Sequence, residues 1–166
     1  MKFQLLVCSL VLFALTCMTG CTVSDDDCQK MNDGMKSMHQ TGLSLFDDHG
    51  NAKHIHSLIA DDQFEQAYGF QHVCPDVIQD TKILFVYSEP TLGSFHMSNV
   101  KAPLDIGFFD QHGVLFDVLR MDVYVDNEQL LYSPTKPFQF ALETHVGFFE
   151  KFMLSPGKSY LIIDSL

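Results

Sequence analysis

The sequence predicts a mainly β (α+β) fold, a compact antiparallel β-barrel-like or strongly curved sheet with two short helices. Several short segments alternate apolar and polar residues, as strands with one buried face do. Turn-forming residues separate these segments, and few stretches have helical spacing. Many short strands with few helices favour a barrel or a curved sheet over a parallel α/β sheet.

Seven segments have the residue pattern of a strand. Residues 83–87 are β-branched and aromatic, and residues 93–98 alternate Phe95 and Met97 with polar side chains. Gln111-His112-Gly113 is typical of a hairpin turn, and Pro156-Gly157 is a turn before the last strand. The predicted strands cover residues 54–60, 83–87, 93–98, 104–110, 114–124, 138–143 and 159–164.

Two segments between the strands are predicted to be helices. Asp61 or Asp62 can cap the first, residues 63–68, and Gly69 can end it. The second covers residues 146–152.

The N-terminus has the pattern of a lipoprotein export signal. In residues 1–20 the only charge is Lys2, and the apolar run over residues 5–18 is too short for a transmembrane helix. Met18-Thr19-Gly20-Cys21 resembles a lipobox, so we expect cleavage before Cys21 and acylation of its sulfur; the alternative is an ordinary signal peptide with a chance cysteine. An Asp directly after the acylated cysteine would indicate retention in the inner membrane. This position is Thr22, so we expect the outer membrane, with the domain facing the periplasm.

The rest of the chain is predicted to be a polar acidic tether, residues 21–42, and one β-rich domain, residues 43–166. The tether carries a Met-rich group whose spacing places three thioethers on one helix face, which suits either a soft Cu(I) site or apolar packing. This group is Met31, Met35, Met38 and His39.

Two cysteines, Cys28 and Cys74, remain after export and acylation. They form an even pair in an oxidising compartment, and either they are bridged or both stay as thiols.

The chain is acidic, with 10 Lys and Arg against 21 Asp and Glu. This balance leaves no basic surface for nucleic acid, so no nucleic-acid partner is expected. An acidic body is repelled by an anionic membrane, so the bilayer partner must be reached through the lipid anchor.

A series of short motifs resembles a known family. The most specific block is Phe95-His96-Met97-Ser98-Asn99 followed by Ala102-Pro103-Leu104-Asp105-Ile106, and the other motifs in order are Ala67-Tyr68-Gly69-Phe70, Lys82-Ile83-Leu84-Phe85-Val86-Tyr87, Asp110-Gln111-His112-Gly113, Leu131-Tyr132-Ser133, Ala141-Leu142-Glu143 and Ser155-Pro156-Gly157-Lys158. Residues 54–163 are similar to the bacterial and archaeal domain of unknown function 192. The resemblance implies a compact, mainly β, barrel-like fold with short helices, and it implies no activity. His96 stands where the family usually has Trp.

The central block suggests a polar site. Asn99 and Asp105 flank a segment that turns rigidly at Pro103, so their side chains can converge. One interpretation makes them the floor of a small-ligand cleft that also includes Met97, Tyr132 and Glu143. The other makes Asn99 and Asp105 a turn lock that bonds its own backbone.

A second metal hypothesis rests on His54 and His56, which share one strand face at a spacing used by zinc sites. The sequence shows no third and fourth ligand beside them, so solvated histidines on an exposed strand are the alternative.

The function predicted from these observations is a non-catalytic envelope module that binds a small ligand, a glycan or an envelope protein, with no cofactor. The alternative is an enzyme acting on envelope material, with Asp105 or Glu143 as acid or base. A further alternative is periplasmic copper or zinc binding through the two clusters described above.

Overall fold

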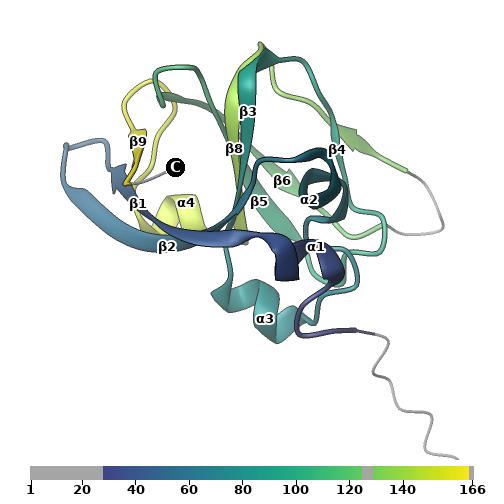
Figure 1. The fold of residues 1–166 in the computed structure, drawn as a ribbon. Helices are drawn as coiled ribbons and strands as arrows, with labels where there is room; N and C mark the ends of the chain where they lie inside the picture. The colour runs from purple at the N-terminus through teal and green to yellow at the C-terminus, as the bar shows by residue number, and fades with distance from the viewer. Residues whose placement is uncertain (1–27, 125–128, 165–166) are drawn as a thin grey trace, which may run out of the picture.

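The computed structural model describes residues 28–124 and 129–164, which form a curved sheet flanked by short helices (Figure 1). The sheet contains β1 (His39–Phe46), β2 (Ala52–Ala60), β3 (Ile83–Thr91), β5 (Leu104–Phe109), β6 (Leu115–Met121), β8 (Phe138–His145) and β9 (Tyr160–Ile163). A separate small pair joins β4 (Phe95–His96) to β7 (Leu131–Tyr132). The helices in the described ranges are α1 (Asp33–Ser37), α2 (Gln63–Tyr68), α3 (Pro75–Asp80) and α4 (Phe148–Lys151).

The predicted curved, mainly β fold with short helices is confirmed. The sheet has the strand order β6-β5-β8-β3-β2-β1-β9 and does not close into a barrel within the described residues. Its two edges nevertheless meet at one point, where Val114 and Tyr160 form an isolated antiparallel bridge. One pair, β2 with β3, is parallel rather than antiparallel, because the chain crosses over through α2 and α3 between them.

Helix α2 begins and ends where its capping residues predict. The Asp62 side chain accepts a hydrogen bond from the Glu65 amide, and Gly69 follows the helix with a positive φ of 46°. Helix α3 is not among the predicted helices, although Pro75 at its first turn is a recognised start signal. None of the helices in the part of the chain that the structure describes is long and apolar enough to cross a bilayer.

The sheet has an apolar core on each face, because successive side chains of a strand point to opposite faces. Ile83 and Phe85 of β3 belong to one core, which α1, the 70–73 turn and α3 cover with Met35, Phe70 and Ile78. Leu84 of β3 belongs to the other core, which α4 covers with Phe148 and Phe149. A side chain's position along its strand therefore decides which half of the molecule it enters.

The segment predicted as a tether, residues 21–42, is partly integrated into the domain. Helix α1 packs on α2, and β1 begins at His39 rather than after residue 42. Met35 and Met38 are buried, so this region belongs to the fold from Cys28 onward. The signal peptide, Cys21 and the rest of the tether lie outside the described residues.

Candidate functional site

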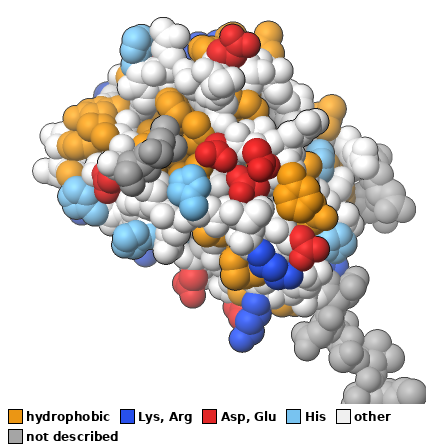
Figure 2. All heavy atoms as spheres, viewed as in Figure 1, with side chains coloured by type: hydrophobic (Ala, Val, Ile, Leu, Met, Phe, Trp, Pro, Cys, Tyr) orange, Lys and Arg blue, Asp and Glu red, His pale blue; other side chains and the backbone are white. Residues whose placement is uncertain are grey.

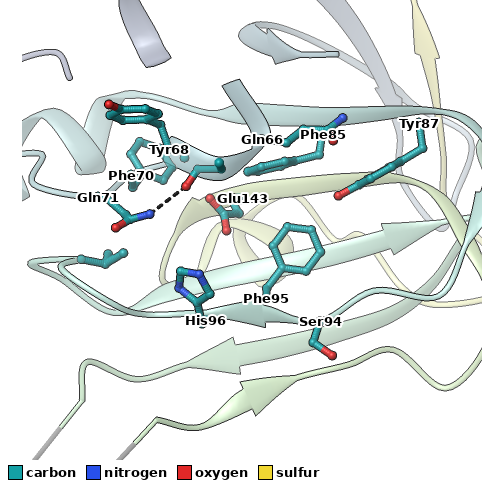
Figure 3. Close-up of a pocket in the computed structure, with 13 residues that line it drawn as sticks. Gln66, Tyr68, Phe70, Gln71, Phe85, Tyr87, Ser94, Phe95, His96 and Glu143 are labelled. Carbon is teal, nitrogen blue, oxygen red and sulfur yellow. Dashed lines mark hydrogen bonds between the residues drawn. The ribbon is translucent and has the colours of Figure 1, made fainter. Parts of the chain in front are cut away.

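A pocket of about 110 Å³ opens between α2, the turn after it, β3, β4 and β8 (Figure 3). Aromatic side chains make much of its wall, namely Tyr68, Phe70, Phe85, Tyr87 and Phe95. Its polar lining includes Gln66, Gln71, Ser94, His96 and Glu143. The pocket therefore combines aromatic side chains with several polar groups that converge on one space, a combination also found in small-molecule sites.

Glu143 forms the floor of this pocket. Its register on β8, opposite Ile83 of β3 and Ile106 of β5, places it on the sheet face of the first core. The residue is 5 % exposed, and burial raises the pKa of its carboxyl to about 8. No residue that the structure describes donates a hydrogen bond to this carboxyl.

Such a carboxyl is uncommon, because buried polar groups are nearly always hydrogen-bonded. At neutral pH a group with this pKa is mainly protonated, so it can donate one hydrogen bond and accept others. In Figure 3 the Glu143 carboxyl faces the space between Gln71, His96 and Phe95. It is therefore a polar group directed at whatever occupies the pocket.

The other polar groups differ in how much bonding capacity they keep. Gln71 is engaged, since its side chain donates to the Ala67 carbonyl (2.7 Å) and accepts from Asn99 (3.2 Å). His96 accepts at Nδ1 from the Ser98 amide (3.3 Å), which leaves Nε2 at the pocket rim. Burial, with a contribution from the Glu143 charge, raises the pKa of Tyr87 to about 12. The Glu143 carboxyl, His96 Nε2 and the Tyr87 hydroxyl are thus three lining groups that can still bond a ligand.

The turn after α2 makes one wall of the pocket and is held by the N-terminal segment. The Asn32 side chain donates to the carbonyls of Gly69 (2.9 Å) and Gln71 (2.8 Å). Cys28 is joined to Cys74 by a disulfide, and the Gln29 amide bonds the His72 carbonyl. At Gly69 an added Cβ would lie 3.5 Å from Glu143 Oε2, so glycine here keeps the wall close to the carboxyl.

The six residues predicted for a ligand cleft are not brought together. Of these, only Glu143 lines the pocket; Met97 and Asn99 line a separate groove beside Tyr124, and Pro103 is exposed. The Tyr132 hydroxyl accepts a hydrogen bond from the Asp122 amide. Asp105 and Glu143 occupy opposite faces of the sheet, because Asp105 pairs with Thr144, one residue beyond Glu143.

Asp105 has a structural role that differs from both earlier interpretations. Its carboxylate accepts from Arg120 Nε (2.5 Å) on β6 and from the Gly147 amide (2.6 Å) at the start of α4. Asn99 instead has a positive φ of 59°, and its carbonyl accepts from His72 (2.8 Å). Asp105 therefore ties β5 to β6 and α4, and it does not lock the turn at Pro103.

Replacing Asp105 by Ala is expected to lower the free energy of unfolding by about 2–3 kcal/mol, because the Gly147 amide loses its acceptor. Arg120 is 46 % exposed and can return to water, so its loss of a partner adds little. Asp105→Asn keeps one acceptor oxygen and should cost less. Urea unfolding measures both variants, and Arg120→Gln is the control for the ion pair. Unchanged midpoints in both Asp105 variants would contradict this role.

The two predicted metal clusters do not form complete sites. Within residues 28–124 and 129–164, no three His, Cys, Asp or Glu side chains are grouped so as to hold a metal ion. His54 Nδ1 lies 3.0 Å from the Ser44 hydroxyl, which also contacts Asp164, while His56 is exposed. The methionines are divided, since Met35 and Met38 belong to the core and Met31 lies in a surface groove that His56 also lines. The alternative interpretation, apolar packing, fits Met35 and Met38.

Sequence reasoning missed most of the pocket. The aromatic residues of its wall fit strand and helix patterns in which they serve only as core. His96 carried a usable signal, because it replaces the Trp usual in the family at a position that the structure places on the pocket rim. Residues 69–71 had two signals, Gly69 as a helix end and the family motif Ala67-Tyr68-Gly69-Phe70, and neither of them indicated a pocket.

Comparisons with known proteins agree with this fold. A search of curated proteins finds no match. One similar solved structure is a "putative transcription regulator" from Sinorhizobium meliloti 1021, with a TM-score of 0.68 and 20 % identity over 78 % of this chain and 98 % of that one. Another is a protein of unknown function from Novosphingobium aromaticivorans DSM 12444, with a TM-score of 0.66 and 17 % identity over 82 % of this chain and 94 % of that one. At these identities the two structures support the fold alone.

The family assignment comes from the sequence itself. The family model of domain of unknown function 192, described as "Uncharacterized ACR", matches residues 45–162. This range contains the motifs from Ala67 to Lys158 on which the resemblance was based, and it covers more than half of the chain. The chain therefore belongs to the domain of unknown function 192 family.

Proposed function

We propose that this chain is an exported lipoprotein of the cell envelope whose domain binds a small ligand in the pocket over Glu143. The observation that carries the binding proposal is the Glu143 carboxyl, which is buried, faces the pocket and receives no hydrogen bond from the described residues. A buried polar group without a partner lowers stability, and a ligand that supplies the missing bonds would offset this cost.

The size of the pocket limits what it can hold. Pockets for whole drug-sized ligands are about 300–1,000 Å³, and this one is about 110 Å³. It therefore fits a very small molecule or one end group of a larger ligand, such as a glycan or an envelope peptide. Binding is proposed as its role rather than catalysis because Asp105, the other carboxylate considered as an acid or base, lies on the other face of the sheet and bonds Arg120 and Gly147.

A catalytic role has one observation in its favour. A carboxyl with a pKa of about 8 in a cleft can act as a general acid at neutral pH. Among the described residues that line the pocket, His96 is the one imidazole, and imidazole is the side chain that most often serves in general acid–base catalysis. This second candidate predicts turnover of a bound compound that is lost in both Glu143→Gln and His96→Gln.

The binding proposal can be tested by a thermal-shift screen of small envelope-derived compounds on the full chain, purified from membranes in detergent. A compound that binds the native state raises the melting temperature in a concentration-dependent way. We expect at least one such compound, with its effect lost in Glu143→Leu. Glu89→Gln is the matched control, since Glu89 is an exposed glutamate on β3. If no compound depends on Glu143, the binding proposal is wrong.

The lipoprotein part of the proposal rests on Met18-Thr19-Gly20-Cys21 and is supported by the Cys28–Cys74 disulfide, since such bonds persist in oxidising compartments. Cys21→Ser is expected to abolish incorporation of a labelled fatty acid, because the acylated sulfur is gone. Metabolic labelling followed by gel analysis measures this. Cys17→Ser is the control and should keep the label, whereas label retained in Cys21→Ser would contradict the assignment.

A further inference from the structure

The ionisable lining of the Glu143 pocket can supply a negative charge at Glu143. Within residues 28–124 and 129–164, Glu143 is the only carboxyl that lines the pocket, and no Lys or Arg of these ranges lines it. An anionic ligand would thus meet no fixed positive charge there, apart from His96 when that ring is protonated. The chain has a formal net charge of −11, and acidic side chains gather near the middle of the face shown in Figure 2. Such a field favours the approach of cations.

The wall of the pocket is also suited to a cation. Five aromatic residues line it, and the Phe85 and Phe95 rings meet edge to face with centroids 5.1 Å apart. In Figure 3, Phe85 and Phe95 lie beside the Glu143 carboxyl, and Tyr87 lies beyond them on the same side. Aromatic rings attract ammonium and guanidinium groups electrostatically, and cages of such rings are a recurring way to bind them. Aromatic rings beside one buried carboxyl therefore offer a cation both a counter-charge and a favourable surface.

We infer that the pocket selects the cationic end of its ligand, an alkylammonium or guanidinium group that pairs with Glu143 between the aromatic rings. This inference rests on the proposed ligand-binding function and names the class of group that the pocket takes. A volume of about 110 Å³ accommodates such a head group without its chain. A neutral ligand would make neither an ion pair with Glu143 nor a cation–π contact with the rings. It is the alternative that the test must distinguish.

When a cation pairs with Glu143, the carboxyl should release its proton, and this release can be measured. Burial raises the pKa of Glu143 to about 8, so the empty pocket holds its proton at pH 7 and a cation displaces it. The other titratable groups that line the pocket are Tyr68 of α2, Tyr87 of β3 and His96 of β4. Tyr87 stays neutral, since its pKa is about 12. If binding requires the ionised carboxylate, affinity for a permanent cation should rise about 50-fold between pH 6 and pH 8.

The test uses four probes on the full chain in detergent: tetramethylammonium, methylguanidinium, acetamide as a neutral probe and acetate as an anion. Binding is followed by NMR titration of the aromatic protons, and proton release by calorimetry in two buffers of different ionisation enthalpy. The expected result is binding of one or both cations, with close to one proton released per cation at pH 7 and at least tenfold weaker binding in Glu143→Gln. His96→Gln should keep the pH dependence, and Glu89→Gln should behave as the wild type.

The outcomes separate the two proposals. If acetamide binds in a way that Glu143→Leu abolishes while the cations do not bind, the ligand site stands and the cation assignment is overturned. Cation binding with no proton release and no loss in Glu143→Gln overturns the assignment as well. If none of the probes binds in a Glu143-dependent way, the cation assignment is overturned, and the thermal-shift screen then decides separately whether a ligand of another class uses the pocket.

Discussion

In Glu143→Gln the protein is expected to lose a pH dependence of stability that the wild type shows between about pH 4.5 and pH 8. The pKa of this carboxyl is raised from 4.5 to about 8 by burial, so in this range the folded state keeps a proton that the unfolded state releases. The contribution of Glu143 to the free energy of unfolding is therefore highest at the acidic end of this range and falls as the pH rises. A tenfold difference in proton affinity is worth about 1.4 kcal/mol, and the total fall is about 5 kcal/mol.

Urea unfolding at pH 5, 7 and 8.5 measures this effect. Glutamine has the shape of the protonated glutamate and cannot ionise, so the variant should match the wild type near pH 5 and exceed its free energy of unfolding at pH 8.5. The difference between the two proteins isolates Glu143 from all other titrating groups. Glu89 is an exposed residue of β3 in the same sheet. The free energy of unfolding of Glu89→Gln should therefore follow that of the wild type at all three pH values. Parallel pH profiles for Glu143→Gln and the wild type would contradict the burial of an unpaired carboxyl.

An effect of this size bears on function, since whole domains have stabilities of only about 5–15 kcal/mol. A glutamine or a leucine at position 143 would remove this loss of stability at higher pH. Neither residue would leave a titrating carboxyl at this position in the pocket. Groups with strongly perturbed pKa values are concentrated at functional sites. The stability measurement therefore tests the premise on which both proposals depend, without requiring a ligand.

Much of the fold follows from local sequence patterns. The caps of α2 and the turn before Val114 are short-range signals, and the structure has each where expected: Asp62 caps the helix, and Asp110 accepts from the amides of His112 and Val114. The parallel pairing of β2 with β3 depends on where the crossover returns the chain, which no local pattern specifies. Strand β1 is absent from the strands predicted from the sequence. One reason is that its first residues are polar and exposed.

The candidate site was less predictable because it depends on strand register. Glu143 and Asp105 are both carboxylates in apolar strands, and the sequence offers no reason to separate them. In the structure a difference of one residue in pairing places them on opposite faces, where Asp105 meets Arg120 and Glu143 meets the aromatic pocket. Because of this register, the two carboxylates predicted for one site have separate roles. Asp105 forms an ion pair, and Glu143 lines the candidate ligand site.

Replacing Cys28 and Cys74 by Ser together is expected to lower the free energy of unfolding by about 4 kcal/mol, the chain-entropy value for a loop of this length. The bridge spans 46 residues and fixes the N-terminal segment to the residue that precedes α3. Urea unfolding of the wild type with and without reductant, beside the double variant, measures the effect.

The same bridge should influence the pocket. It anchors the segment from which Asn32 holds the carbonyls of Gly69 and Gln71, and these residues form the wall beside Glu143. We therefore expect reduction to weaken Glu143-dependent binding as well as stability, while the double variant, already without the bridge, should not respond to reductant. Recovery of both cysteines as alkylatable thiols in the non-reduced protein would contradict the pairing. A fully stable reduced protein would instead show that Asn32 and the backbone bonds at Gln29 hold the wall without it.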